Sequence, residues 1–237
     1  MRESCSFPRG KLTLVLLLLL IPIVVFGGAR LFQEKHYAWI ALCVALLSCL
    51  PLFICFERKG STAKELTTLA VLVAVSAAGR FAFVWVPGFK PVTAITVIAA
   101  MYLGREAGFV VGSLSAVVSN FYFGQGPWTP FQMFAWGFLG FLAGILAAPL
   151  KRRKLWMILY GVLAGLLFSV IMDVWATLWA DGTFNLSRYL AALISAIPVA
   201  LEYAVSNVVF LLLLARPIGE KLERIKTKYG LFQPADR

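Results

Sequence analysis

SNFYFGQGPWTPFQMFAW, residues 119–136, is an uncharged, aromatic-rich segment between two long apolar runs. It carries the amides of Asn120, Gln125 and Gln132 together with the hydroxyl of Thr129. Aromatic faces stack on flat ligands, and amides donate and accept hydrogen bonds, so the segment predicts the wall of a small-molecule site. An interfacial aromatic belt is the alternative, and it explains the Trp and Tyr residues but not the amides.

The bulk composition predicts a membrane protein. The 237 residues are 61% hydrophobic with a mean hydropathy of +0.86, which is more apolar than a soluble core requires. The net charge of +11 does not indicate a nucleic-acid partner, because Lys and Arg cluster between and after apolar runs. The four cysteines show no metal-ligand spacing and are interpreted as small apolar residues. We therefore expect an all-α, polytopic membrane protein.

Apolar runs near the spanning length of roughly 20 residues predict eight transmembrane helices, the fourth of them short. These are residues 12–29, 37–56, 65–87, 91–104, 106–123, 130–150, 155–180 and 188–215. With both termini cytoplasmic, 17 of the 22 Lys and Arg residues lie on the inner side and four in outer loops, while Arg80 falls within a span. This asymmetry predicts that residues 119–136 face outward across the cell membrane.

A change of composition divides the chain into two predicted parts. Residues 1–56 are rich in Leu, Val and Cys, as expected of a two-helix membrane anchor. Residues 62–230 are rich in Gly, Ala and Ser with isolated polar residues, as expected of a packed six-helix bundle with a C-terminal cytoplasmic extension. A signal peptide at 12–29 is the alternative for the first helix, but the apolar run is long and its cleavage site weak.

The extension after Arg216 has an apolar stripe beneath a basic face. The stripe consists of Ile218, Leu222, Ile225 and Tyr229. This pattern predicts that the last helix continues along the membrane surface.

Small residues recur every four positions on several predicted helices, and such ridges let helix backbones approach closely in lipid. The ridges are Gly104, Gly108, Gly112 and Ala116; Gly140 and Gly144; Gly161 and Gly165; and Ala70, Ala74 and Ala78. Packing within the bundle is the general interpretation. The alanine ridge differs because Arg80 lies about 200° around the helix from Ala78. One side of that helix can therefore dock on a partner while Arg80 faces the interior.

Three ionisable residues fall well within the spans of the predicted bundle: Arg80, Asp173 and Glu202. Each costs roughly 2.5–3.5 kcal/mol to insert, so each needs a partner or a ligand. An ion pair between Arg80 and Asp173 and direct ligand contact are both open. Two pairs share faces at the outer ends of their helices, Trp175 with Trp179 and Gln132 with Trp136, and Tyr203 with Asn207 continues a polar line down the last helix. The combination predicts an outward-opening, aromatic-walled pocket.

The sequence lacks the motifs that several kinds of chemistry require. The chain has no phosphate-binding loop, and its one histidine, His36, lies in an outer loop of the anchor. No serine–histidine or histidine–metal arrangement is available to the bundle, so we expect neither catalysis nor a metal or other cofactor. Matching inverted repeats of the kind found in many secondary transporters are also missing. A binding bundle without a motor implies that a partner supplies the motor.

Residues 62–230 resemble the substrate-binding S component of energy-coupling factor (ECF) vitamin transporters. The features that match are the six spans, the alanine ridge, PGFKPVTAI at 87–95, KRRK at 151–154, and GREAGFVVGSLSAVVSNFYFGQGPWTPFQM at 104–133. The last block is similar to the subgroup assigned to cobalamin. The resemblance implies partners: a vitamin ligand, a transmembrane coupling subunit and two ATPase subunits. The two helices of residues 1–56 go beyond the six-helix family pattern.

The resemblance also implies roles for residues. The alanine ridge, Ala70, Ala74 and Ala78, would contact the coupling subunit. The expected substrate-binding residues are Arg80, Asn120, Tyr122, Gln125, Trp128, Gln132, Trp136, Asp173, Trp175, Trp179, Glu202 and Tyr203. Cobalamin is the leading ligand and a smaller planar vitamin such as riboflavin the alternative. A second class of function is an intramembrane, lipid-modifying enzyme with Asp173 and Glu202 as acid and base.

Overall fold

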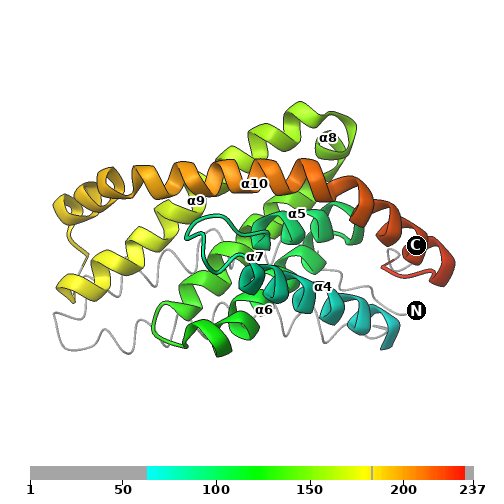
Figure 1. Cartoon of the computed structure of the whole chain (residues 1–237), viewed down its shortest axis with the longest axis horizontal. Helices are drawn as coiled ribbons and strands as arrows, with labels where there is room; N and C mark the ends of the chain where they lie inside the picture. Colours follow the sequence, from blue (N-terminus) through cyan, green and yellow to red (C-terminus); the bar gives the residue numbers. More distant parts are fainter. Residues whose placement is uncertain (1–62, 183, 233–237) are drawn as a thin grey trace, which may run out of the picture.

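The computed structural model describes residues 63–182 and 184–232, and the described residues are helical, with no strand among them (Figure 1). The predicted anchor spans at 12–29 and 37–56 lie outside the described residues. The helices are α4 (Ala63–Ala82), α5 (Val92–Leu103), α6 (Arg105–Phe123), α7 (Thr129–Ile145), α8 (Ala147–Arg152), α9 (Lys154–Asp181) and α10 (Leu186–Tyr229). The all-α fold class predicted from the sequence is confirmed.

The helices follow the predicted spans closely, with one division. The span predicted at 130–150 consists of α7 and the short α8, which are separated at Leu146. Three helices, α4, α9 and α10, are long and apolar enough to cross a membrane, while α5 and α7 are shorter apolar helices. The chain is therefore a helical membrane protein.

The short helix α5 lies at the centre of the bundle. It contacts α4, α6, α7 and α10, and all its residues except Tyr102 are buried. At 1.5 Å per residue its 12 residues extend only about 18 Å, less than the roughly 30 Å of a hydrocarbon core. The short helix is tolerated because neighbouring helices, and not lipid, surround it.

Two helix pairs pack closely at small residues. A Cβ atom added at Gly112 on α6 would lie 2.4 Å from the backbone oxygen of Trp136 on α7, and one at Gly165 on α9 would lie 2.5 Å from the backbone nitrogen of Ala204 on α10. These distances leave no space for a methyl group. The sequence prediction that glycine ridges pack within the bundle therefore holds for α6 with α7 and for α9 with α10.

The two faces of α4 have different surroundings. Leu69, Leu72, Ser76 and Arg80 are buried against the other helices. The alanine ridge, Ala70, Ala74 and Ala78, is exposed on the opposite side. The geometry leaves the ridge accessible to a partner, and its role as a docking surface stays a prediction.

The C-terminal part of α10 continues to Tyr229, as predicted. The first half of its apolar stripe packs on the bundle: Leu222 is buried, Ile218 packs against the core, and Gly219 meets the Tyr102 ring. The Lys226 Nζ donates to the Tyr102 carbonyl at 3.2 Å. Tyr229 at the end of the stripe is exposed, and the position of this segment along a membrane surface stays a prediction.

Candidate functional site

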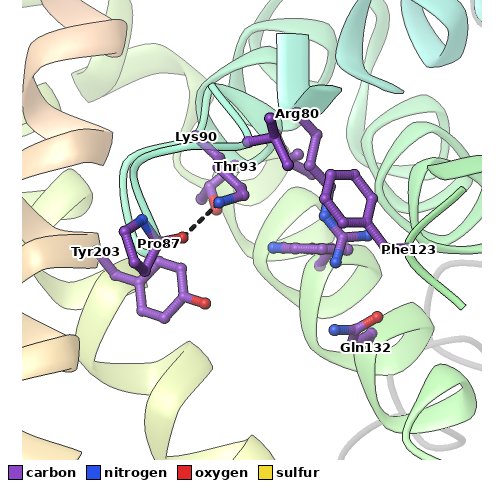
Figure 2. A pocket seen from close by; sticks show the side chains of 10 residues that line it. Arg80, Pro87, Lys90, Thr93, Phe123, Gln132 and Tyr203 are labelled. Atoms are coloured by element: carbon purple, nitrogen blue, oxygen red, sulfur yellow. Dashed lines mark hydrogen bonds between the residues drawn. The ribbon is translucent and has the colours of Figure 1, made fainter. Parts of the chain in front are cut away.

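A pocket of about 390 Å³ lies at the end of the bundle where α4 and α6 end and α5 and α7 begin (Figure 2). By the predicted topology this is the outer end. The pocket is lined by Arg80, Val84, Pro87, Lys90, Val92, Thr93, Phe123, Gln132, Trp136 and Tyr203. It therefore brings together Arg80, Gln132, Trp136 and Tyr203 of the predicted site residues.

Arg80 contributes a buried guanidinium to the pocket from the last turn of α4. Its Nη1 donates to Ser119 Oγ at 2.5 Å and to Asn120 Oδ1 at 2.7 Å, both on α6. The guanidinium carbon lies 4.4 Å from the centre of the Phe123 ring and 5.1 Å from that of Trp136. Contacts of this kind hold a cation over aromatic faces. The side chain is only 9% exposed, and its Nε has no hydrogen-bond partner among the described residues.

The amides of residues 119–136 mostly bond to one another. The Asn120 Nδ2 donates to Thr129 Oγ1 at 3.0 Å and to Gln132 Oε1 at 2.8 Å, which joins α6 to α7. Gln125 accepts from Thr129 Oγ1 at 3.1 Å and donates to the Val117 carbonyl at 2.9 Å. Asn120 and Gln125 thus shape the turn between the two helices, and of these amides Gln132 lines the pocket.

Aromatic side chains from three helices form one wall of the site. The Trp136 ring of α7 stacks on Phe168 of α9, with ring centres 5.1 Å apart and planes inclined by 17°. Phe168 meets Tyr203 of α10 edge to face, also at 5.1 Å. Trp136 and Tyr203 both line the pocket, so the wall presents an aromatic face and a phenol to its interior.

The segment between α4 and α5, residues 83–91, covers the pocket and is tied to α10. The Lys90 backbone nitrogen donates to Ser206 Oγ at 2.8 Å, and the same hydroxyl donates to the Lys90 carbonyl at 3.1 Å. Phe83 and Phe89 pack around Phe210 with ring centres 5.1 and 4.8 Å away. These contacts fix the position of the segment on α10.

Lys90 is a pocket residue that the sequence analysis did not select. Its Nζ donates to the carbonyls of Val86 and Pro87, so the amine is held beside the pocket (Figure 2). Burial lowers the pKa of Lys90, the positive charge of Arg80 lowers it further, and the carboxylate of Glu202 opposes both. Its place in the PGFKPVTAI motif was the available signal. Thr93 and Phe123 were also missed, because apolar and hydroxyl residues at helix ends carry no distinctive pattern.

The remaining predicted aromatic residues are not among those that line the pocket, although Tyr122 meets the lining residue Phe123 edge to face at 5.1 Å. Trp128, Trp175 and Trp179 form a row, with ring centres 5.9 Å and 6.3 Å apart along it. Tyr122 is 64% exposed and packs edge to face on Phe81 with a centre distance of 4.6 Å. The row and the Tyr122–Phe81 pair stay predictions as parts of a larger binding surface.

The two predicted carboxylates also lie outside the pocket lining. Asp173 forms no ion pair with Arg80 within residues 63–182, and its Oδ2 is buried without a hydrogen-bond partner there. Glu202 packs against Gly88, where an added Cβ would lie 2.7 Å from its carboxyl carbon. No cluster of three His, Cys, Asp or Glu residues suited to a metal occurs in the part of the chain that the structure describes.

Comparison with known proteins gives one match. The family model described as ECF-type riboflavin transporter, S component, matches residues 60–224, well over half of the 237 residues. Comparisons with curated proteins and with solved structures gave no match.

Proposed function

The chain belongs to the S-component family of ECF-type riboflavin transporters, and from this premise we propose that it captures a flavin-sized vitamin in the pocket between Arg80, Trp136 and Tyr203. As an S component it is the substrate-binding membrane subunit of an ECF-type importer, which operates with the ECF module. The family is one of transporter subunits and not of enzymes. Neither Asp173 nor Glu202 lines the pocket, so the acid–base alternative gains no support from the geometry.

The pocket itself carries the proposal. Its volume of about 390 Å³ lies in the range of small-molecule sites, which begins near 300 Å³. Phe123 and Trp136 contribute aromatic surface to the lining, and Gln132, Thr93 and Tyr203 offer hydrogen-bonding groups. A planar, heteroaromatic vitamin such as riboflavin has an aromatic ring system and hydrogen-bonding groups that match this lining. The description of the matching family supports the same ligand.

Cobalamin is the second candidate ligand. The similarity of the 104–133 block to the cobalamin subgroup favours it, as do the exposed aromatic residues near the pocket, among them Trp85 at 91% and Tyr122 at 64% exposed. A corrin ring is much larger than a flavin, so it would need the Trp128–Trp175–Trp179 row and the surface around Tyr122 in addition to the pocket. The two ligands therefore predict binding surfaces of different extent.

Titration of the purified chain in detergent separates the ligands. We expect riboflavin fluorescence to be quenched on binding, with cyanocobalamin unable to compete. Trp136→Ala should weaken riboflavin binding at least tenfold, because it removes aromatic surface from the pocket lining. Trp179 is 57% exposed and lies outside the pocket lining, so Trp179→Ala is the matched control. Its affinity for riboflavin should stay within twofold of that of the wild type. Binding of cyanocobalamin alone, weakened by Trp179→Ala, would reject the flavin in favour of the larger vitamin.

Asp173→Ala tests how far the site extends. If the ligand reaches the outer half of α9, loss of this carboxylate weakens binding directly. The buried Oδ2 without a partner supports that extension. An affinity equal to that of the wild type would limit the site to the pocket lining.

The importer assignment also predicts topology and docking. With both termini cytoplasmic in the cell membrane, Trp85→Cys should react with a membrane-impermeant maleimide on intact cells. Labelling only after permeabilisation would reverse the orientation and place the pocket on the inner side. The exposed alanine ridge on α4 supports docking of the coupling subunit on that face.

A further inference from the structure

The pocket has an uneven charge. Arg80 and Lys90 both line it, and none of the described residues that line it is acidic. Lys90 is anchored by the Val86 and Pro87 carbonyls. Glu202 lies behind the same segment, packed against Gly88. A ligand inside the pocket therefore meets two cations and no carboxylate.

Arg80 has a donor that its structural contacts do not use. The Nη1 atom accounts for both hydrogen bonds to α6, through Ser119 and Asn120. The guanidinium lies 4.4 Å from the centre of the Phe123 ring and 5.1 Å from that of the Trp136 ring, and Figure 2 shows it beside Phe123. The Nε atom stays buried without a partner in a side chain that is only 9% exposed. Leaving a buried charged donor unsatisfied is unfavourable, and an electron-rich ligand group near the guanidinium offsets part of that cost through its charge.

A purely structural role for Arg80 explains only part of this arrangement. A residue that merely joined α4 to α6 would need the Nη1 contacts and no opening to a cavity. Arg80 instead borders the pocket together with a second cation and a hydrogen-bonding amide, Gln132. The position of these groups is the one expected for recognition of an electron-rich ligand edge.

We infer that the pocket selects its vitamin through an electron-rich, hydrogen-bond-accepting edge, which lies beside the positive charges of Arg80 and Lys90 in the pocket lining. This inference rests on the proposed function and specifies the ligand chemistry of that site. On a flavin the matching edge is the N1 and C2 carbonyl side of the pyrimidine ring. On a corrinoid it is a peripheral amide carbonyl or the phosphate.

Flavin analogues in which one ring nitrogen is replaced by carbon test the inference on the wild-type protein. The N1 acceptor is absent from 1-deazariboflavin, whereas 5-deazariboflavin keeps it and changes the opposite side of the central ring. We expect the first analogue to bind about 10–100-fold more weakly than riboflavin, the range for one hydrogen bond to a charged donor, and the second to bind within about threefold. Equal weakening by both analogues would overturn the inference.

Variants identify the donor. Arg80→Met should reduce riboflavin affinity about 10–100-fold and abolish the preference for riboflavin over 1-deazariboflavin. Arg80→Lys retains a cation and a donor, so it should fold if Arg80→Met does not, and it should recover only part of the preference because it lacks the planar guanidinium. Arg216→Met removes an exposed cation paired with Glu220 at 2.9 Å far from the pocket and should leave affinity and preference unchanged.

The outcomes distinguish the inference from the proposed function. If riboflavin binds and the analogue preference survives in both Arg80 variants, the inference is wrong while the proposed function stands. If cyanocobalamin binds in place of riboflavin, an Arg80→Met loss of tenfold or more supports the inference, and an unchanged affinity rejects it. If the wild type binds neither probe, the proposed function fails, and the inference that rests on it fails too.

Discussion

Two glycines one turn apart on α9 give a sharp test of how helix packing shapes the pocket. An added Cβ at Gly165 would lie 2.5 and 2.7 Å from the Ala204 backbone nitrogen and Cα on α10. At Gly161 the nearest atom is a side-chain methyl of Val208 at 3.0 Å. Ordinary contact begins at 3.4 Å, so Gly165→Ala must separate the helices by about 0.9 Å. At Gly161 the nearest backbone atom, the Val208 nitrogen, lies at 3.1 Å, so Gly161→Ala needs a shift of only about 0.3 Å.

The two substitutions share every local effect. Each replaces Gly by Ala within a helix, which favours folding by about 1 kcal/mol. At Gly165 the overpacking of two backbones costs about 1–3 kcal/mol on top of that common term, so the difference between the variants is about 1–3 kcal/mol. For a domain of this size, that corresponds to a melting temperature about 2–12 °C lower for Gly165→Ala than for Gly161→Ala.

The pocket gives a second measure of the same displacement. The Cβ at Gly165 would also approach the Tyr203 backbone carbonyl carbon at 2.9 Å, and Tyr203 lines the pocket. We expect Gly165→Ala to weaken riboflavin binding about tenfold and Gly161→Ala to leave it unchanged. Thermal unfolding in detergent and fluorescence titration measure the two effects. Equal melting temperatures and equal affinities for the two variants would refute the packing of α9 on α10 described above.

Three further predictions use the same purified protein. Ala74→Trp should abolish vitamin uptake with the ECF module but leave binding in calorimetry unchanged, because bulk on the exposed ridge blocks docking. Leu213→Trp on the exposed face of α10 is the control, and loss of binding in Ala74→Trp would show that the ridge faces the interior of the bundle. Ser206→Ala should speed hydrogen exchange of the Lys90 amide at least tenfold, because its acceptor is removed, and unchanged exchange would contradict the tie between α10 and residues 83–91. Burial and then the charge of Arg80 hold the pKa of Lys90 below its ordinary 10.5, so the unfolded chain binds this proton more tightly than the folded one. Between the lowered pKa and 10.5, the melting temperature of the wild type should therefore rise with pH relative to that of Lys90→Met. Melting temperatures of the two proteins that change in parallel with pH would refute the shift.

Much of the architecture was predictable from local patterns. The spans at 91–104, 106–123 and 155–180 agree with α5, α6 and α9 to within one residue at each end. The length of an apolar run predicts where a span begins and ends, and this length can be read from the segment alone, without knowledge of the other helices. The break at Leu146 between α7 and α8 was missed, although Pro149 in the first turn of α8 removes a backbone donor there and is its signal in the sequence.

Part of the site was predictable for a similar reason. Arg80, Gln132, Trp136 and Tyr203 stand out as polar or aromatic residues near the ends of apolar helices, and the pocket contains all four. Lys90 and Phe123 were missed because a loop cation and a phenylalanine are common in any membrane protein. The amides of Asn120 and Gln125 were expected to face a ligand, but most of their hydrogen bonds connect the turn between α6 and α7.

The sequence by itself determined the extent of most of the described helices, their membrane character and the family, because transfer of apolar side chains into lipid and small-residue spacing are properties of each segment alone. Only the tertiary structure decided that Arg80 bonds to Ser119 and Asn120 and not to Asp173, and that the stripe containing Leu222 packs on the bundle. Those contacts depend on how each helix is rotated and tilted against its neighbours. That orientation follows from the packing of all the helices together, which no single segment encodes.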